Sequence, residues 1–288
     1  MDLIAQQLVN GLSAGVAYAL VALGLTLIFG VLHVINFAHG ELYMLGGLVT
    51  VIACNLLGVP YLVTLVLAPV IMLVVGVGLD KLAIGPLLDR RDGLSDVVLS
   101  TFAVSLLLLD LVLAVVGPAP ERVEGLSGVL ILGPVIISHQ RLFVIVLGFI
   151  LIAGLDAMLR YSRFGIEMRA AAQDRFAAEA VGIDVNAIGT RTIMLGAAIA
   201  GIAGALLVPV TQFTPLMGQN VVIKAFVVVV IGGMGSGPGA VLCGVGLGLI
   251  EALVNIRFSE GMTTAIIYSL LLVGLLMRPQ GLFGRAAR

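Results

Sequence analysis

The side chains that usually carry chemistry are few in this chain and lie far apart. It has three histidines, His33, His39 and His139, and two cysteines, Cys54 and Cys243, both in apolar stretches. A hydrolytic or metal site needs such groups gathered as a nucleophile with its base or as a ligand cluster, and this spacing supplies neither. We therefore expect no catalytic residue, no metal, no other cofactor and no disulfide.

The two lysines exclude one further kind of chemistry. A phosphate-binding loop of the form GxxxxGK[ST] needs a lysine directly after a glycine, whereas Lys81 follows an aspartate and Lys224 follows an isoleucine. The chain itself is therefore not expected to bind ATP in that way. Its net charge of -1 gives no basis for a nucleic-acid partner either.

The composition indicates a multi-pass membrane protein. Hydrophobic residues make up 60% of the 288 residues, charged residues make up 11%, and the mean hydropathy is +1.21, whereas a soluble domain carries about 25% charged residues. The first residues, MDLIAQQLVNG, lack the basic segment of a cleaved signal peptide, so we expect none. The predicted fold is all-α: one transmembrane helix bundle, residues 1–288, with broken or re-entrant helices.

One long segment between the apolar stretches is strongly charged, residues 160–192. Five arginines and four acidic residues fall within it. Alanines and apolar residues recur there at helical spacing, and Gly182 is a suitable stop. We expect a short, weakly amphipathic helix outside the membrane. Two interpretations stay open: a solvated loop whose charges set orientation, or a docking element for a cytoplasmic partner.

Apolar stretches of roughly 20 residues predict the spans that position these groups. Within the stretch 193–210, Gly196, Ala200 and Gly204 recur at intervals of four residues, which predicts a face for helix–helix contact. The predicted spans are 8–31, 61–79, 97–116, 142–159, 193–210 and 263–277, and shorter apolar arms cover 42–57, 221–231 and 240–254.

Basic residues predict the orientation, because cytoplasmic loops carry an excess of lysine and arginine. The 160–192 loop and the tail 278–288 are the most basic segments, so both are placed in the cytoplasm. The loop 117–141 then lies outside, and residues 221–254 must begin and end outside as a hairpin or re-entrant pair. The side of the N-terminus stays open. The other basic residues that support this assignment are Lys81, Arg90, Arg91, Arg278, Arg285 and Arg288.

Two interruptions separate short apolar arms in opposite halves of the chain: His33–Glu41, HVINFAHGE, and Gly232–Gly239, GGMGSGPG. Such paired breaks point to a transport pathway, because backbone outside a helix must be buried in protein or line a watery cavity. The alternative is that both are ordinary turns between helices. The pathway candidates are Asn36, His39, Glu41, Gly233, Gly235 and Gly237.

Three charged residues fall inside apolar stretches: Asp110, Lys224 and Glu251. A charge at the centre of a membrane helix costs roughly 2.5–3.5 kcal/mol on insertion scales, but each of these lies nearer an end, where the cost is lower. We favour a structural hydrogen-bonding role for Asp110 and an interfacial anchor for Lys224. An ion-coupled transporter acting alone would depend on Asp110, and a channel would have no need of the charged loop.

At this point the residues resemble a known family, the branched-chain amino acid ABC importer permeases of the LivH type. Its hallmark resembles residues 24–47, GLTLIFGVLHVINFAHGELYMLGG, and residues 160–189 resemble its version of the EAA loop. Residues 224–251 and the tail RPQGLFG are also similar to family segments. The resemblance covers nearly the whole chain and leaves the solute open, since permeases for urea and short amides share these motifs.

The resemblance implies a multi-subunit importer in the bacterial inner membrane. The expected partners are two cytoplasmic ATP-binding subunits, a second permease of the LivM type and a periplasmic or lipid-anchored solute-binding protein. Residues 169–182 would form the helix that couples to the ATPases and moves when ATP is hydrolysed, although the loop lacks a literal EAA triplet. Its motif positions are Arg169, Ala171, Ala172, Asp174, Glu179 and Gly182.

Overall fold

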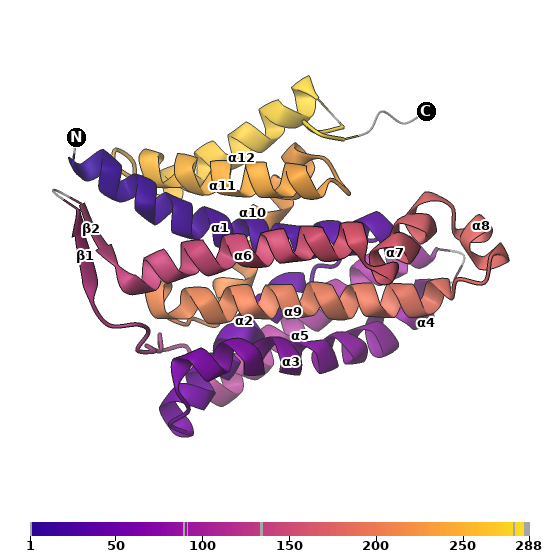
Figure 1. Cartoon of the computed structure of the whole chain (residues 1–288), viewed down its shortest axis with the longest axis horizontal. Coiled ribbons are helices and arrows are strands. Elements are labelled where there is room, and N and C mark those ends of the chain that lie inside the picture. Colours follow the sequence, from indigo (N-terminus) through magenta and orange to yellow (C-terminus); the bar gives the residue numbers. More distant parts are fainter. Residues whose placement is uncertain (1, 89, 91, 133–134, 279, 285–288) are drawn as a thin grey trace.

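Helices make up most of the chain in a computed structural model that describes residues 2–88, 90, 92–132, 135–278 and 280–284 (Figure 1). The predicted cytoplasmic residues Arg91, Arg285 and Arg288 lie outside this part of the chain. In chain order the elements are α1 (Asp2–Leu32), α2 (His39–Val51), the π-helical turn η1 (Ile52–Leu56), α3 (Tyr61–Leu79), the π-helical turn η2 (Asp80–Ile84), α4 (Gly85–Leu88), α5 (Gly93–Val116), β1 (Val129–Leu132), β2 (Val135–Ser138), α6 (His139–Tyr161), α7 (Arg163–Gln173), α8 (Arg175–Ala180), α9 (Val185–Thr211), α10 (Met217–Gly232), α11 (Gly237–Val254) and α12 (Glu260–Met277).

Seven of the described helices are long and apolar enough to cross a membrane, which confirms a multi-pass helical protein. Six of them, α1, α3, α5, α6, α9 and α12, coincide with the spans predicted from hydropathy, and α11 contains the predicted arm 240–254. The sequence analysis missed the antiparallel hairpin of β1 and β2, in which Val129 pairs with Ser138. Its two short strands lie in a loop rich in glycine and proline.

Helices α1 and α9 form the centre of the bundle. Figure 1 shows α12, α11, α1, α9 and α3 stacked in that order, with α6 in front, contacting α1 and α9. Small residues allow these close contacts, as predicted: a Cβ on Gly196 of α9 would come within 3.2 Å of the Gly24 carbonyl oxygen of α1. Gly204 of the same stripe packs on the α2 backbone at Tyr43.

The two halves of the chain repeat one order of elements in opposite directions. In each half a long helix (α1 or α9) is followed by an extended segment, a helix that starts inside the bundle (α2 or α10) and a helix that packs on the long helix of the other half: α3 on α9, and α11 on α1. The long helices end alike, because His33 and Gln212, with φ of 56° and 71°, are the only non-glycine residues with positive φ in the described chain. Inverted repeats of this kind bring broken helices together near the middle of the membrane.

The predicted cytoplasmic segments gather at one end of the bundle. Helices α4, α7 and α8 lie there, at the right of Figure 1, and the N-terminus and the β1–β2 hairpin lie at the other end. The Gln6 side chain accepts a hydrogen bond from the Ile136 amide of β2 at 3.0 Å, which fixes the start of α1 at the hairpin end. Helices α10 and α11 form the predicted hairpin. Its turn lies at the end that carries α4, α7 and α8, here called the basic end.

Candidate functional site

The charged loop forms two short helices rather than one. Ser162 caps α7 by accepting a hydrogen bond from the Gly165 amide at 3.0 Å, and Asp174 caps α8 by accepting one from the Ala177 amide at 3.0 Å. A single helix over residues 169–182 is therefore wrong, because extended backbone at Asp174 ends α7 and starts α8. Gly182, with φ of 89°, follows the end of α8, as expected for a helix stop.

The loop residues singled out from the sequence take different positions. The guanidinium of Arg169 donates to the carbonyl oxygens of Leu159 and Arg160, so it ties α7 to the last turn of α6. Ala171 is buried, whereas Glu179 is exposed and forms an ion pair with Arg175 at 3.3 Å. Two exposed side chains one helical turn apart gain little from such a pair, so Glu179 remains available to a partner.

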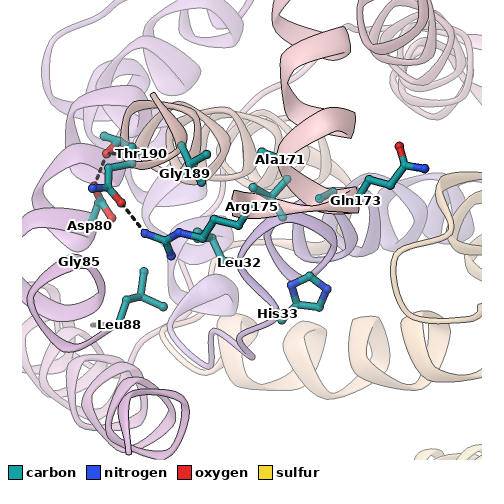
Figure 2. Close-up of a pocket in the computed structure, with 14 residues that line it drawn as sticks. Leu32, His33, Asp80, Gly85, Leu88, Ala171, Gln173, Arg175, Gly189 and Thr190 are labelled. Atoms are coloured by element: carbon teal, nitrogen blue, oxygen red, sulfur yellow. Dashed lines mark hydrogen bonds between the residues drawn. The ribbon is translucent and has the colours of Figure 1, made fainter. Parts of the chain in front are cut away.

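A cavity of about 470 Å³ separates this loop from the membrane helices. Figure 2 shows Arg175 reaching into it from α8, where its guanidinium donates to Asn186 Oδ1 of α9 at 3.0 Å. On the same side, Thr190 Oγ1 of α9 donates to Asp80 Oδ2 of η2 at 2.6 Å. The cavity is also lined by Leu32 and His33, the end of α1. Residues of α1, α8, α9 and η2 thus surround one cavity.

The two helices that start inside the bundle meet at glycines. His39, the first residue of α2, lies beside the second half of α1: its Nε2 atom is 3.1 Å from the Val21 carbonyl oxygen. Gly218, at the start of α10, packs so closely on Gly40 that a Cβ on Gly218 would come within 2.7 Å of the Gly40 carbonyl oxygen. The backbone on either side of this crossing runs through the interior of the bundle, as the sequence predicted for the first break.

Three polar side chains at this crossing are fully buried: Asn36, His39 and Glu41. Glu41 Oε1 accepts a hydrogen bond from Ser105 Oγ of α5 at 3.1 Å, and its Oε2 has no hydrogen-bond partner among the described residues. The same is true of His39 Nδ1 and Asn36 Nδ2. His39 and Glu41 do not contact each other through a hydrogen bond in this part of the chain, so they form no proton pair.

The second break lies elsewhere than predicted. Gly233, Gly235 and Gly237 form the turn between α10 and α11 at the basic end, where the Phe283 amide of the tail donates to the Gly232 carbonyl oxygen at 3.2 Å. The interruption inside the bundle is the segment 212–216, before α10. Sequence reasoning missed it, although a proline at 215 and a glycine at 218 mark it, because the glycine-rich turn gave the stronger helix-breaking signal.

The structure also changes the roles expected for the charged residues inside spans. Asp110 is exposed on α5 and makes no hydrogen bond to any described residue, so the structural role expected for it is wrong. Lys224 of α10 and Glu251 of α11 form an ion pair at 2.5 Å.

The described part of the chain contains no group of three or more His, Cys, Asp or Glu side chains that could hold a metal ion.

Known proteins resemble the chain over almost its whole length. Residues 7–277 match the family described as branched-chain amino acid transport system / permease component. The chain is 34% identical to the high-affinity branched-chain amino acid transport system permease protein BraD of Pseudomonas aeruginosa, over 97% of this chain and 95% of that one. It is 32% identical to LivH of Escherichia coli, over the same shares, and 29% identical to a probable LivH of Methanocaldococcus jannaschii, over 92% and 88%. No solved structure matches the chain.

Proposed function

The chain belongs to the permease family of branched-chain amino acid transport systems, and on this premise we propose that it forms part of the solute pathway of an ATP-driven importer of branched-chain or other hydrophobic amino acids. It is a multi-pass permease subunit of the cell inner membrane and not an enzyme. Partner components of an ABC transport system follow from the family. All 288 residues are taken as one permease domain, with a coupling loop at 160–192 and a cytoplasmic tail at 278–288.

The proposed partners are two cytoplasmic ATP-binding subunits, a second permease of the LivM type and a periplasmic or lipid-anchored solute-binding protein. The absence of a nucleotide-binding motif from this sequence agrees with ATP hydrolysis in separate subunits. The partners would meet opposite ends of the permease: the ATPases at α7 and α8, and the binding protein at the end that carries the β1–β2 hairpin.

The observation that carries the proposal is the position of α8. This exposed helix contacts α9 through Arg175 and Asn186, and the cavity beneath it is lined by the end of α1. Helices α1 and α9 are the long helices that lead into the two interrupted segments. An ATPase that moves α8 would therefore shift both segments together, which is the motion that alternating access requires.

The proposed pathway runs past the crossing of α2 and α10, where Asn36, His39 and Glu41 line its wall. Support comes from the buried, incompletely paired polar atoms of these residues, since polar groups inside a membrane protein usually face a pathway or a partner. The turn of Gly233, Gly235 and Gly237 is proposed as part of the cytoplasmic exit, beside α7, because Arg169 and Gly237 line the same cavity of about 620 Å³.

Co-purification tests the proposal directly. The tagged chain is solubilised from native membranes under conditions that keep a known ABC importer intact, and the proteins recovered with it are identified. We expect two ATP-binding subunits and a second permease, and the purified complex should take up L-leucine into proteoliposomes when ATP and the binding protein are supplied. Recovery of the chain alone, with transport activity in that form, would contradict the importer assignment.

A further inference from the structure

A charged cluster inside the bundle lies apart from the coupling loop and from the α2–α10 crossing. Lys224 Nζ of α10 lies 2.5 Å from Glu251 Oε1 of α11 and 3.0 Å from the Tyr18 hydroxyl of α1. The same ammonium group lies 5.1 Å from the centre of the Tyr18 ring. Three helices thus contribute to one site: α1, α10 and α11.

The position of the cluster is not that of an interfacial anchor. Lys224 lies halfway along α10, and its side chain turns inward to Glu251 rather than outward to water. Both side chains are only partly exposed, 19% for Lys224 and 16% for Glu251, whereas Glu41 is completely buried. Glu251 lies near the C-terminal end of α11, away from the turn between α10 and α11.

The cluster contains one hydrogen-bond acceptor without a donor. Glu251 Oε2 is buried and has no partner among the residues that the structure describes. An unpaired acceptor of this kind is costly inside a membrane protein. It would be satisfied by an ammonium group, while Lys224 and the Tyr18 hydroxyl offer donors to a carboxylate.

We propose that Lys224, Glu251 and Tyr18 bind the zwitterionic headgroup of an α-amino acid as it enters the permease. The inference rests on the proposed function and deepens it by naming the residues that would bind the charged groups of the solute. The ammonium group of the solute binds Glu251 and its carboxylate binds Lys224, so each charge of the internal pair exchanges one partner for another. The net charge of the site stays zero throughout, which avoids leaving an isolated charge inside the membrane.

The same geometry separates α-amino acids from urea and short amides, the alternative solutes that the sequence resemblance leaves open. An uncharged amide cannot replace either member of an ion pair, so it would leave Lys224 and Glu251 bound to each other. A pathway for neutral solutes would gain nothing from placing two charges at this depth. The cluster therefore favours a zwitterionic solute.

The test uses the complete importer in proteoliposomes, with its binding protein at saturating concentration and radiolabelled L-leucine as the probe. In the double variant K224M/E251Q both charges are removed together, because a matched removal avoids an unpaired buried charge. We expect this variant to assemble and to keep the thermal unfolding temperature of the wild type. Its uptake of L-leucine should fall at least about tenfold, since a charged ligand loses both of its partners.

A second variant distinguishes recognition from a structural ion pair. The exchange K224E/E251K keeps the pair and reverses its direction, so a purely structural pair would be restored together with uptake. Recognition of a zwitterion in one orientation predicts that this variant assembles but takes up L-leucine poorly. Uptake within about twofold of the wild type in either variant would overturn the proposal. If the wild-type complex binds both ATPases but takes up no L-leucine, the solute class on which both proposals rest is wrong.

Discussion

Replacing Asp174 by alanine tests whether α8 must be folded for ATPase coupling. The carboxylate of Asp174 accepts a hydrogen bond from the Ala177 amide at 3.0 Å and caps a helix of only six residues. Loss of such a cap costs about 1 kcal/mol, and a helix this short has little stability of its own. The ratio of folded to frayed α8 should therefore fall about fivefold.

Asp184 provides a matched control in the same loop. It also accepts a hydrogen bond from the amide three residues later, Ala187, at 3.0 Å, but it caps α9, which has 27 residues and is largely buried. The variant D184A loses a cap of the same kind without unfolding the helix behind it. The variant D174N provides the second control, because asparagine caps helices about as well as aspartate and lacks the charge.

The assay measures ATP hydrolysis and L-leucine uptake in the same proteoliposomes and reports molecules transported per ATP hydrolysed. We expect this ratio to fall in D174A, by at most about fivefold, because the folded fraction of α8 falls by less than the ratio of folded to frayed helix does. It should stay near the wild-type value in D184A and D174N. A wild-type ratio in D174A would refute the role of α8. Equal losses in D174A and D174N would show that the charge of Asp174, rather than its cap, is what the partner needs.

Three further changes test the other parts of the proposal. The variant Glu179→Lys breaks only an exposed pair, worth about 0.5 kcal/mol or less, so the permease should stay folded while ATPase binding in a pull-down falls; unchanged binding would remove Glu179 from the contact. The variant Gly218→Ala forces a Cβ to within 2.7 Å of Glu41 Oε2 and should destabilise the protein by about 1–3 kcal/mol. Its unfolding temperature should be lower than that of the control Gly246→Ala, whose Cβ meets nothing within 4 Å. The variant Glu41→Gln keeps the shape of the side chain and the hydrogen bond from Ser105 and removes a buried acidic group, so it should unfold no earlier than the wild type. Uptake should fall about tenfold if Glu41 lines the pathway, and normal uptake would exclude that role.

Hydropathy predicted the spans well because it depends on the feature that decides them, which is the length of uninterrupted apolar sequence. The span 61–79 matches α3 to the residue, and the stripe through Gly196 and Gly204 does form helix contacts. Depth in the membrane could not be predicted in the same way. His39 and Gly233 both lie in the predicted breaks, yet only His39 lies in the interior of the bundle. The depth of a residue depends on which helices pack on each other, and hydropathy does not give that.

Contacts between distant segments account for the other differences. Lys224 and Glu251 are separated in sequence by a turn and most of a helix, so their pairing appears only once α10 and α11 fold back on each other. The helix boundary at Asp174 was not predicted, and here the cause is local. The alanine-rich composition around it favours one continuous helix, whereas its side chain instead caps a second one. Capping signals compete with propensity over short distances, and here the cap decides where the helices begin and end.

The inverted order of elements explains how one loop can act on two breaks. Helix α1 runs toward the coupling loop and continues into the segment before α2, whereas α9 starts at the loop and runs away from it to the segment before α10. The loop touches the end of one long helix and the start of the other, and Asp80 joins α9 to the end of α3 through Thr190. Under the proposed function, a displacement of the coupling loop would move α1 and α9 at the same end of the bundle. Helices α2 and α10 cross at Gly40 and Gly218, where a Cβ on Gly218 would come within 2.7 Å of the Gly40 carbonyl oxygen. A larger residue at either position would therefore force the two helices apart.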